Sequence, residues 1–321
     1  MKDAKLAVVY FKDSLNIGDD IQTYAAARLL PKVDYYLDRE SLNKPPTDEK
    51  IKLICSGWFM KKPENWPPAP NIEPLFISMH IDSSSDVHKH MLSGELLEYY
   101  KKHEPIGCRD WYTVDLFRNA GVEAYFSGCL TLTVAPDHEV KRNKTVYLVE
   151  PFTKFISKHY IKYNLKRLIP KQETPNVEYV SHYPIQLNNK PIAERLKEAK
   201  NLLDKYAAAR MVITSRIHCA LPSLGLDTPV YFTDVGYNRK HAKIRFKGLS
   251  DFFTIIDDSY FPLTNNQPWG KLLRMFYCYR LMPKKKPIPI DWHPKPTTEK
   301  PESLQAIIDQ LKNTVDSFVN K

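Results

Sequence analysis

The stretch that decides the fold reads Met211-Val212-Ile213-Thr214-Ser215-Arg216-Ile217-His218-Cys219-Ala220-Leu221-Pro222. It begins with four residues that favour a strand and continues with small and apolar residues at helical spacing. A strand that leads directly into a helix is typical of a parallel α/β sheet, because the helix carries the chain back to the start of the next strand. The sequence therefore predicts a strand over Met211–Thr214 and a helix over Ile217–Leu226.

The same alternation of strand and helix patterns extends in both directions from this junction. In the first half, strands are predicted at Leu6–Phe11, Lys52–Cys55, Pro74–Ser78, Pro105–Cys108 and Glu123–Phe126, and helices at Asp20–Leu30, Ser93–Lys101 and Asp110–Ala120. In the second half, further strands are predicted at Thr145–Val149, Val177–Ser181 and Pro229–Phe232, and a further helix at Ile192–Ala209.

A polar, charged stretch at Pro136–Asn143 separates the two series of elements. The fold class predicted is therefore α/β, with Rossmann-like domains at 1–140 and 141–262 that face a cleft at the carboxyl ends of their strands. The remaining unit, 263–321, contains a strap rich in Pro and Lys from Pro283 to Pro301. A final helix over Glu302–Val319 has its apolar residues on one face, so we expect it to dock on a domain.

The net charge of +10 is concentrated in two segments that also carry aromatic residues, 152–171 and 268–300. Such segments suit an anionic lipid surface or a phosphorylated ligand, and a solvated basic face without a partner explains them equally well. No nucleic-acid-binding signature is present, so nucleic acid is not expected as a partner. The residues Trp269–Met282, followed by Lys284-Lys285-Lys286, predict either an interfacial helix on an anionic membrane or a helix packed on the second domain.

No apolar run approaches the roughly 20 residues that span a bilayer, and the N-terminus does not resemble a signal peptide. We therefore expect a cytoplasmic protein, with peripheral contact at the inner membrane face if the basic helix is interfacial. The five cysteines are scattered and none forms a C-x-x-C pair. The sequence predicts neither a metal site nor a cofactor, and the pattern His88-x-His90 favours polar contacts over a metal.

The turn after the first strand reads Asn16-Ile17-Gly18-Asp19-Asp20. A glycine at a strand-to-helix turn lets a ligand approach the backbone N–H groups at the helix start, which form a natural anion site. Asp19 or Asp20 is also a good helix N-cap, which is the structural alternative for either residue. The turn is not G-x-G-x-x-G, so a dinucleotide is not predicted.

A second junction, Gly107-Cys108-Arg109-Asp110, ends a strand and begins a helix. An arginine at this position is directed into the cleft, where its planar fork can hold a carboxylate or a phosphate. The alternatives are an Arg109–Asp110 surface pair and an N-cap at Asp110.

At the third junction Arg216 and His218 are two residues apart near a helix start, so both can reach one bound group. A histidine can give or take a proton near neutral pH. A purely structural histidine is the alternative.

At these three junctions the sequence resembles the polysaccharide pyruvyl transferase family. The N-x-G-D turn, the G-x-R-D strand end and the S-R-x-H helix start occur here in family order, and Ala242–Leu249 is similar to the family's closing segment. The resemblance covers roughly residues 5–255. Where many members carry Gly-Gly after the third strand, this chain has Ser56-Gly57-Trp58.

The resemblance implies a glycosyltransferase-B-like arrangement and transfer of a pyruvyl group from phosphoenolpyruvate onto two hydroxyls of a saccharide, which is free or lipid-linked. The donor carries a carboxylate and a phosphate, and Arg109 and Arg216 would bind them from opposite domains. His218 is the candidate general acid, and Asp19 or Asp20 would accept a proton from the sugar. The other expected substrate-binding residues are Asn16, Gly18, Gly57, His80 and Ser215.

Two other functions fit the same pattern. A nucleotide-sugar glycosyltransferase would hold its pyrophosphate with Arg216, although only Glu150 is a candidate acid for the ribose in the second domain. A non-catalytic saccharide-binding protein is the other alternative, which the retention of His218 with both arginines argues against.

Overall fold

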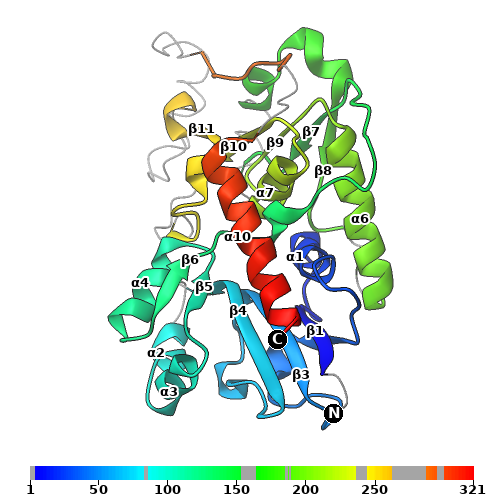
Figure 1. Cartoon of the computed structure of the whole chain (residues 1–321). Helices are drawn as coiled ribbons and strands as arrows, with labels where there is room; N and C mark the ends of the chain where they lie inside the picture. The colour runs from blue at the N-terminus through cyan, green and yellow to red at the C-terminus, as the bar shows by residue number, and fades with distance from the viewer. Residues whose placement is uncertain are drawn as a thin grey trace.

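The computed structural model describes residues 4–82, 86–152, 164–184, 187, 189–235, 244–261, 287–294 and 300–321. Two parallel sheets lie one above the other, with helices packed against them (Figure 1). The predicted α/β class is confirmed. Every strand of the first sheet precedes Ser127 and every strand of the second follows Thr145, while the domain boundaries themselves stay a prediction.

The first sheet has six strands in the order β2-β1-β3-β4-β5-β6. These are β1 Lys5–Tyr10, β2 Tyr35–Asp38, β3 Ile51–Phe59, β4 Ile72–Ile81, β5 Ile106–Cys108 and β6 Ala124–Phe126. The helices of this half are α1 Ile17–Ala27, α2 Val87–Met91, α3 Glu95–Lys101 and α4 Trp111–Asn119.

The second sheet has five strands in the order β11-β10-β9-β7-β8. These are β7 Val146–Val149, β8 Val177–Val180, β9 Met211–Thr214, β10 Val230–Asp234 and β11 Thr254–Asp257. The longer helices that accompany it are α6 Ile192–Ala208 and α7 Ile217–Gly225, and α10 Glu302–Val319 ends the chain.

Both sheets repeat one strand order. If the strands of each sheet are numbered along the chain, their order across the sheet is second, first, third, fourth, fifth. The first sheet has a sixth strand after the fifth. Successive strands are therefore added to opposite sides of β1 in the first sheet and of β7 in the second. The switch points lie between β1 and β3 and between β7 and β9. Ligands of open α/β sheets bind outside the carboxyl ends of the strands at such a switch point.

Successive side chains of a strand point to opposite faces of its sheet, and the buried apolar residues therefore form three cores. Ala7 and Val9 face a core beneath the first sheet, whereas Val8 faces the second half of the molecule. Likewise Leu148 faces a core outside the second sheet, and Tyr147 faces inward. Because Val8 and Tyr147 belong to the same cluster, the two halves share one continuous apolar core rather than facing an open cleft.

The final helix occupies the predicted residues, Glu302–Val319, and joins the two halves. Its buried residues Leu304, Ile308, Leu311 and Val315 all belong to the shared core. At its start Lys300 pairs with Asp227 of the second half, and at its end the Lys52 Nζ of β3 donates to the carbonyl oxygen of Phe318 at 3.0 Å. The helix therefore docks across both halves (Figure 1).

Two strands, β2 and β11, were not predicted. Both are four-residue edge strands, and β11 is largely exposed, so neither has the continuous apolar pattern of a central strand. The first helix was predicted to begin at Asp20 but begins at Ile17, because Asn16 is its N-cap and accepts from the backbone N–H of Gly18 at 3.1 Å. Neither Asp19 nor Asp20 caps it.

A buried ion pair connects the two halves. Asp20 of α1 is held by Arg195 of α6 through both carboxylate oxygens, at 2.8 and 3.0 Å. Both side chains are less than a tenth exposed, and Arg195 also donates to the carbonyl oxygen of Ser14 at 2.7 Å. Since both oxygens of Asp20 are engaged, the structure contradicts its predicted role as a proton acceptor.

This pair predicts a large effect on stability. Arg195→Met should lower the free energy of unfolding by about 3–5 kcal/mol, because it leaves the Asp20 carboxylate buried without a partner. Arg28→Met, which breaks an exposed pair with Asp137, should cost about 0–1 kcal/mol. Urea unfolding measures both. Adding Asp20→Asn to Arg195→Met should recover part of the loss, and equal losses in the two single variants would contradict the assignment.

Candidate active site

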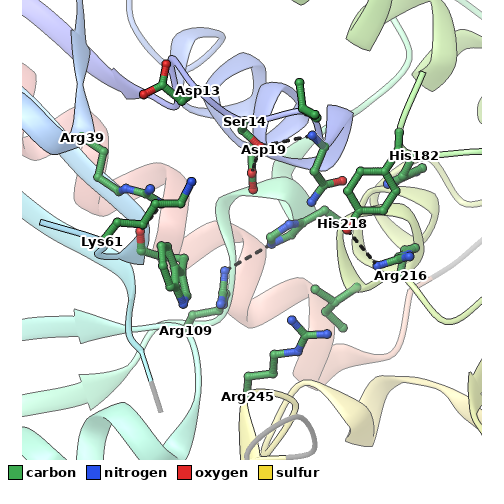
Figure 2. Close-up of a pocket in the computed structure, with 15 residues that line it drawn as sticks. Asp13, Ser14, Asp19, Arg39, Lys61, Arg109, His182, Arg216, His218 and Arg245 are labelled. Atoms are coloured by element: carbon green, nitrogen blue, oxygen red, sulfur yellow. Dashed lines mark hydrogen bonds between the residues drawn. The ribbon is translucent and has the colours of Figure 1, made fainter. Parts of the chain in front are cut away.

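A pocket of about 350 Å³ lies where the two switch points meet. Asn16 after β1 and Trp58 at the end of β3 line it from the first half, and Arg216 after β9 lines it from the second. Figure 2 shows Arg109, Arg216, His218 and Arg245, which come from different elements, around this pocket. The strand order of the two sheets thus places the pocket where the sequence analysis expected a ligand.

The lining of this pocket is strongly cationic. Among the described residues, its charged side chains are the cations Arg39, Lys61, Arg109, Arg216 and Arg245 and the carboxylates Asp13 and Asp19 (Figure 2). An excess of fixed cations in a partly enclosed site favours an anionic ligand. Only two of the five cations were predicted as site residues. Arg39 follows β2, a strand that was not predicted, and Lys61 and Arg245 lie outside the three junctions from which the site residues were predicted.

Arg39 owes its position to aromatic rings. Its Cζ lies 5.0 Å from the centre of the Phe11 ring and 4.5 Å from that of Trp58. Its Nη1 donates to the Trp58 carbonyl oxygen at 2.9 Å, and Glu40 pairs with it from behind. Trp58, the last residue of the stretch Ser56-Gly57-Trp58, therefore supports a cation at the pocket wall.

Arg109 lies at the end of β5 and is only 3% exposed. Its Nη1 donates to Gln22 Oε1 and to His218 Nε2, each at 3.2 Å. Its Nε is buried and has no hydrogen-bond partner among the described residues. Burial lowers the pKa of this guanidinium. Arg109 is thus a buried cation with a spare donor beside the pocket, and it is not a surface partner of Asp110, which caps α4 instead.

Gln22 connects Arg109 to Asp19. Its Nε2 donates to Asp19 Oδ1 at 3.0 Å, and the Ser14 hydroxyl donates to Asp19 Oδ2. The side chains of Asp19, Gln22, Arg109 and His218 therefore form one hydrogen-bonded chain across both halves. Burial raises the pKa of Asp19, and the Ser14 hydrogen bond and nearby arginines oppose that shift. Gln22 was not predicted, although its three-residue spacing from Asp19 on one helix face is a usable signal.

His218 is neutral in this arrangement. An arginine can only donate, so the Nε2 of His218 accepts from Arg109 and the ring proton lies on Nδ1. Burial holds the pKa of His218 well below its usual value, and the charges of Arg109 and Arg245 lower it further. A proton on Nε2 would displace the Arg109 hydrogen bond, and negative charge in the pocket would favour that proton.

Arg216 borders the pocket but is already paired. Its Nε is bound by Glu150 Oε2, and its Nη1 lies 3.4 Å from the Tyr183 hydroxyl. The Tyr183 ring also lies against the guanidinium, with 5.0 Å from Cζ to the ring centre. These contacts orient Arg216 at the pocket wall before any ligand arrives.

Five predicted site residues do not line the pocket, namely Asp20, Ser215, His80, Gly57 and Gly18. Asp20 is held by Arg195, and the Ser215 hydroxyl donates to the Glu150 carbonyl oxygen at 2.6 Å. His80 is 1% exposed, with its Nδ1 2.7 Å from Asp110 Oδ2. Gly57 has φ +116°, and a Cβ there would lie 2.6 Å from the Phe11 ring. The contacts of these residues are with other residues of the protein, so we assign them a structural role next to the pocket.

The predicted anion site at the start of α1 is also occupied by the protein itself. The N–H of Ile17 donates to the His182 carbonyl oxygen at 2.9 Å, and those of Gly18 and Asp19 donate to Asn16. A Cβ on Gly18 would lie 3.2 Å from His218 Cβ. Gly18 therefore allows close packing of α1 against the second half, and it does not provide access for a ligand.

Other expectations concern metals, cysteines and membranes. Among the described residues, no group of three or more His, Cys, Asp and Glu side chains is placed to hold a metal ion. Four cysteines, Cys55, Cys108, Cys129 and Cys219, are buried and unpaired. Within the described ranges, no helix is both long enough and apolar enough to cross a membrane. The predicted interfacial segment, Trp269–Met282 with Lys284–Lys286, lies outside the described residues.

Comparisons with known proteins place the chain in a family. A family profile described as polysaccharide pyruvyl transferase matches residues 16–237, a range that holds Asn16, Arg109, Arg216 and His218. Among solved structures, an uncharacterized protein from Klebsiella pneumoniae is similar at 11% identity, covering 79% of this chain and 92% of that chain with a TM-score of 0.41. A TM-score this low carries no argument about function. No curated protein matches the chain.

The buried histidines predict a loss of stability in acid. Burial lowers the pKa of His182 to about 3, and Arg216 contributes to the shift. Between about pH 6.5 and pH 3 the unfolded chain therefore binds a proton at this residue that the folded chain does not, so stability falls as pH falls. His182→Gln should remove about 2 kcal/mol of the decline between pH 6.5 and pH 5.0.

Urea unfolding at the two pH values measures this difference. His138→Gln, at an exposed position, is the matched control and should decline as the wild type does. An undiminished decline in His182→Gln would show that His182 is not the residue responsible.

Proposed function

The chain belongs to the polysaccharide pyruvyl transferase family, and we propose that it transfers the pyruvyl group of phosphoenolpyruvate onto a saccharide in surface polysaccharide biosynthesis. The observation that carries this proposal is the set of five cationic side chains that line one pocket together with His218. Phosphoenolpyruvate combines a carboxylate and a phosphate in a small molecule, so it needs several cations converging from different directions.

The two predicted arginines suit the two ends of the donor. Arg109 approaches from the first half with an unused Nε, and Arg216 approaches from the second half with its fork partly engaged by Glu150. Ile217 and His218, the first two residues of α7, both line the pocket, and the start of this helix would add to the binding of a phosphate.

The reaction requires proton transfer in two directions. Protonation of the terminal enol carbon makes the adjacent carbon electrophilic, and a sugar hydroxyl attacks that carbon and loses its proton. The second hydroxyl then closes the ketal as phosphate departs, and the proton of this hydroxyl leaves on the phosphate. His218 is the proposed acid, and the negative charge of the bound donor would raise its pKa into the working range. Asp19, which lines the pocket, is the proposed acceptor of the hydroxyl proton.

The two alternative functions fit less well. A nucleotide-sugar glycosyltransferase would need Glu150 for a ribose, but Glu150 is engaged by Arg216 and by the Ser181 hydroxyl at 3.0 Å. A saccharide-binding protein without activity would have no use for the buried chain from Asp19 to His218. A glycosyltransferase-B-like arrangement, independence from metals and cofactors, a cytoplasmic location and a lipid-linked acceptor at an anionic membrane remain parts of the proposal.

Donor identity is tested first. Phosphoenolpyruvate should raise the melting temperature more than UDP or GDP does, with about 2.7 kcal/mol of stabilisation at 100 times its dissociation constant. Arg109→Met should abolish the shift, because a buried anion that loses its partner costs about 2–5 kcal/mol of binding. Arg28→Met, outside the pocket, is the control. Stabilisation by a nucleoside diphosphate alone would favour the glycosyltransferase.

Acid catalysis is tested through His218. His218→Gln should bind phosphoenolpyruvate about as well as the wild type and lower turnover by about 10²–10⁴-fold. Release of inorganic phosphate in the presence of a saccharide panel measures turnover, and calorimetry measures donor binding. His138→Gln should match the wild type in both assays. Full turnover in His218→Gln would assign the acid to another group.

A further inference from the structure

Arg245 reaches the pocket from a short turn, residues 245–249, which we term the arginine turn. The turn belongs to the second half of the chain and lies between β10 and β11. The N–H groups of Leu249 and Ser250 donate to the carbonyl oxygen of Phe246 at 3.0 and 2.9 Å. Phe246 and Leu249 are buried, and both belong to the core that the two halves share. The second half therefore anchors the turn through apolar side chains, while Arg245 lines the pocket (Figure 2).

The other side of the arginine turn lies on the first half of the molecule. Trp111 is the first residue of α4, and the N–H group of a first helical residue has no carbonyl partner within its own helix. The Trp111 N–H donates instead to the Lys247 carbonyl oxygen at 3.1 Å. The Trp111 ring stacks on the Phe126 ring of β6, with 5.2 Å between the ring centres and 14° between the planes. A backbone hydrogen bond and a pair of stacked rings therefore meet the turn from the first half.

Gly248 allows the arginine turn to lie directly against these two rings. Its φ is +94°, which residues with a side chain rarely adopt. A Cβ at this position would lie 2.7 Å from Trp111 Cδ1 and 2.9 Å from Phe126 Cε2. The contact has no room for even one further carbon atom, so the position of the turn depends on the position of the two rings.

This contact brings together two cations that repel each other. Arg109 and Trp111 belong to the same strand-to-helix junction, so one short stretch of chain places Arg109 in the pocket and holds the turn that carries Arg245. Burial lowers the pKa of the Arg109 guanidinium, and the charge of Arg245 lowers it further. An anion that binds between two such cations cancels their repulsion and accepts from both. A phosphate, with a charge of about −1.5 to −2 at pH 7, matches two guanidinium groups better than a carboxylate does.

We propose that Arg109 and Arg245 bind one phosphate group between them, and that Trp111 is a positioning residue that holds Arg245 in place for it. The phosphate site spans the two halves, because Arg109 follows β5 and Arg245 follows β10. Trp111 is not among the described residues that line the pocket, so its effect on binding passes through the arginine turn. The identification of this phosphate with that of the donor rests on the proposed function.

A double-mutant cycle in the full chain tests the inference, with inorganic phosphate as the probe and calorimetry as the measurement. Arg245→Met should raise the dissociation constant of phosphate at least about tenfold, and Trp111→Ala should raise it about fivefold or more. In the Arg245→Met background, Trp111→Ala should change it by less than about twofold, because the residue through which it acts is gone. Trp111→Phe, which keeps a ring on Phe126, should recover most of the affinity. Lys247→Met, which removes only an exposed pair with Asp115 on the same turn, should stay within about twofold of the wild type.

Gly248→Ala disturbs the same contact from the other side and should weaken phosphate binding as Trp111→Ala does, so the inference stays testable if one variant fails to fold. Wild-type affinity in Trp111→Ala, or an equal loss in both backgrounds, would overturn the positioning role. No binding of phosphate to the wild type, or a loss in Arg245→Met of pyruvate binding alone, would overturn the phosphate site. If phosphate binding depends on Trp111 and Arg245 but phosphoenolpyruvate does not compete with phosphate, the site stands and the pyruvyl transfer fails.

Discussion

The structure depends on the close approach of α1 to the second half of the molecule. At Gly18 a side chain would lie 3.2 Å from His218 Cβ and 3.3 Å from His182 Nδ1, so only glycine fits without displacement. The Ile17 N–H fixes this approach by donating to the His182 carbonyl oxygen. Because the helices meet here, the two halves share an apolar core and His218 comes within 3.2 Å of Arg109. The pocket is the space that this contact leaves open.

The repeated strand order explains why polar residues converge at that space. Each sheet reverses between its first and third strands, and the carboxyl ends of those strands cannot be covered by the crossover helices. Asn16 and Trp58 follow or end such strands in the first sheet, and Glu150 and Arg216 follow them in the second. Two switch points that face each other give one site with walls from both halves. This arrangement suits a reaction whose two substrates must meet.

The sequence predicted most of the fold because central parallel strands and amphipathic helices leave a periodic pattern, whereas the short edge strands β2 and β11 do not. Arg109, Arg216 and His218 were predicted to meet because each stands at a strand-to-helix junction, and they line the same pocket. Arg39 could not be found this way, since the rings of Phe11 and Trp58 place it through tertiary contacts. Asp19 and Asp20 were equivalent in the sequence, and only Arg195, 175 residues away from Asp20, separates their roles.

The charges around His218 also connect donor binding with acid catalysis in the proposed reaction. Without a ligand, burial and the surrounding arginines keep His218 neutral, so the free protein holds no acid at this position. A bound donor brings negative charge next to Arg109 and Arg245, which cancels part of the field that lowers the pKa of His218. In the proposed reaction, the acid would therefore form when the donor is bound. A saccharide that enters first finds a cationic pocket without a proton donor, so donor binding has to precede chemistry even where both substrates bind independently.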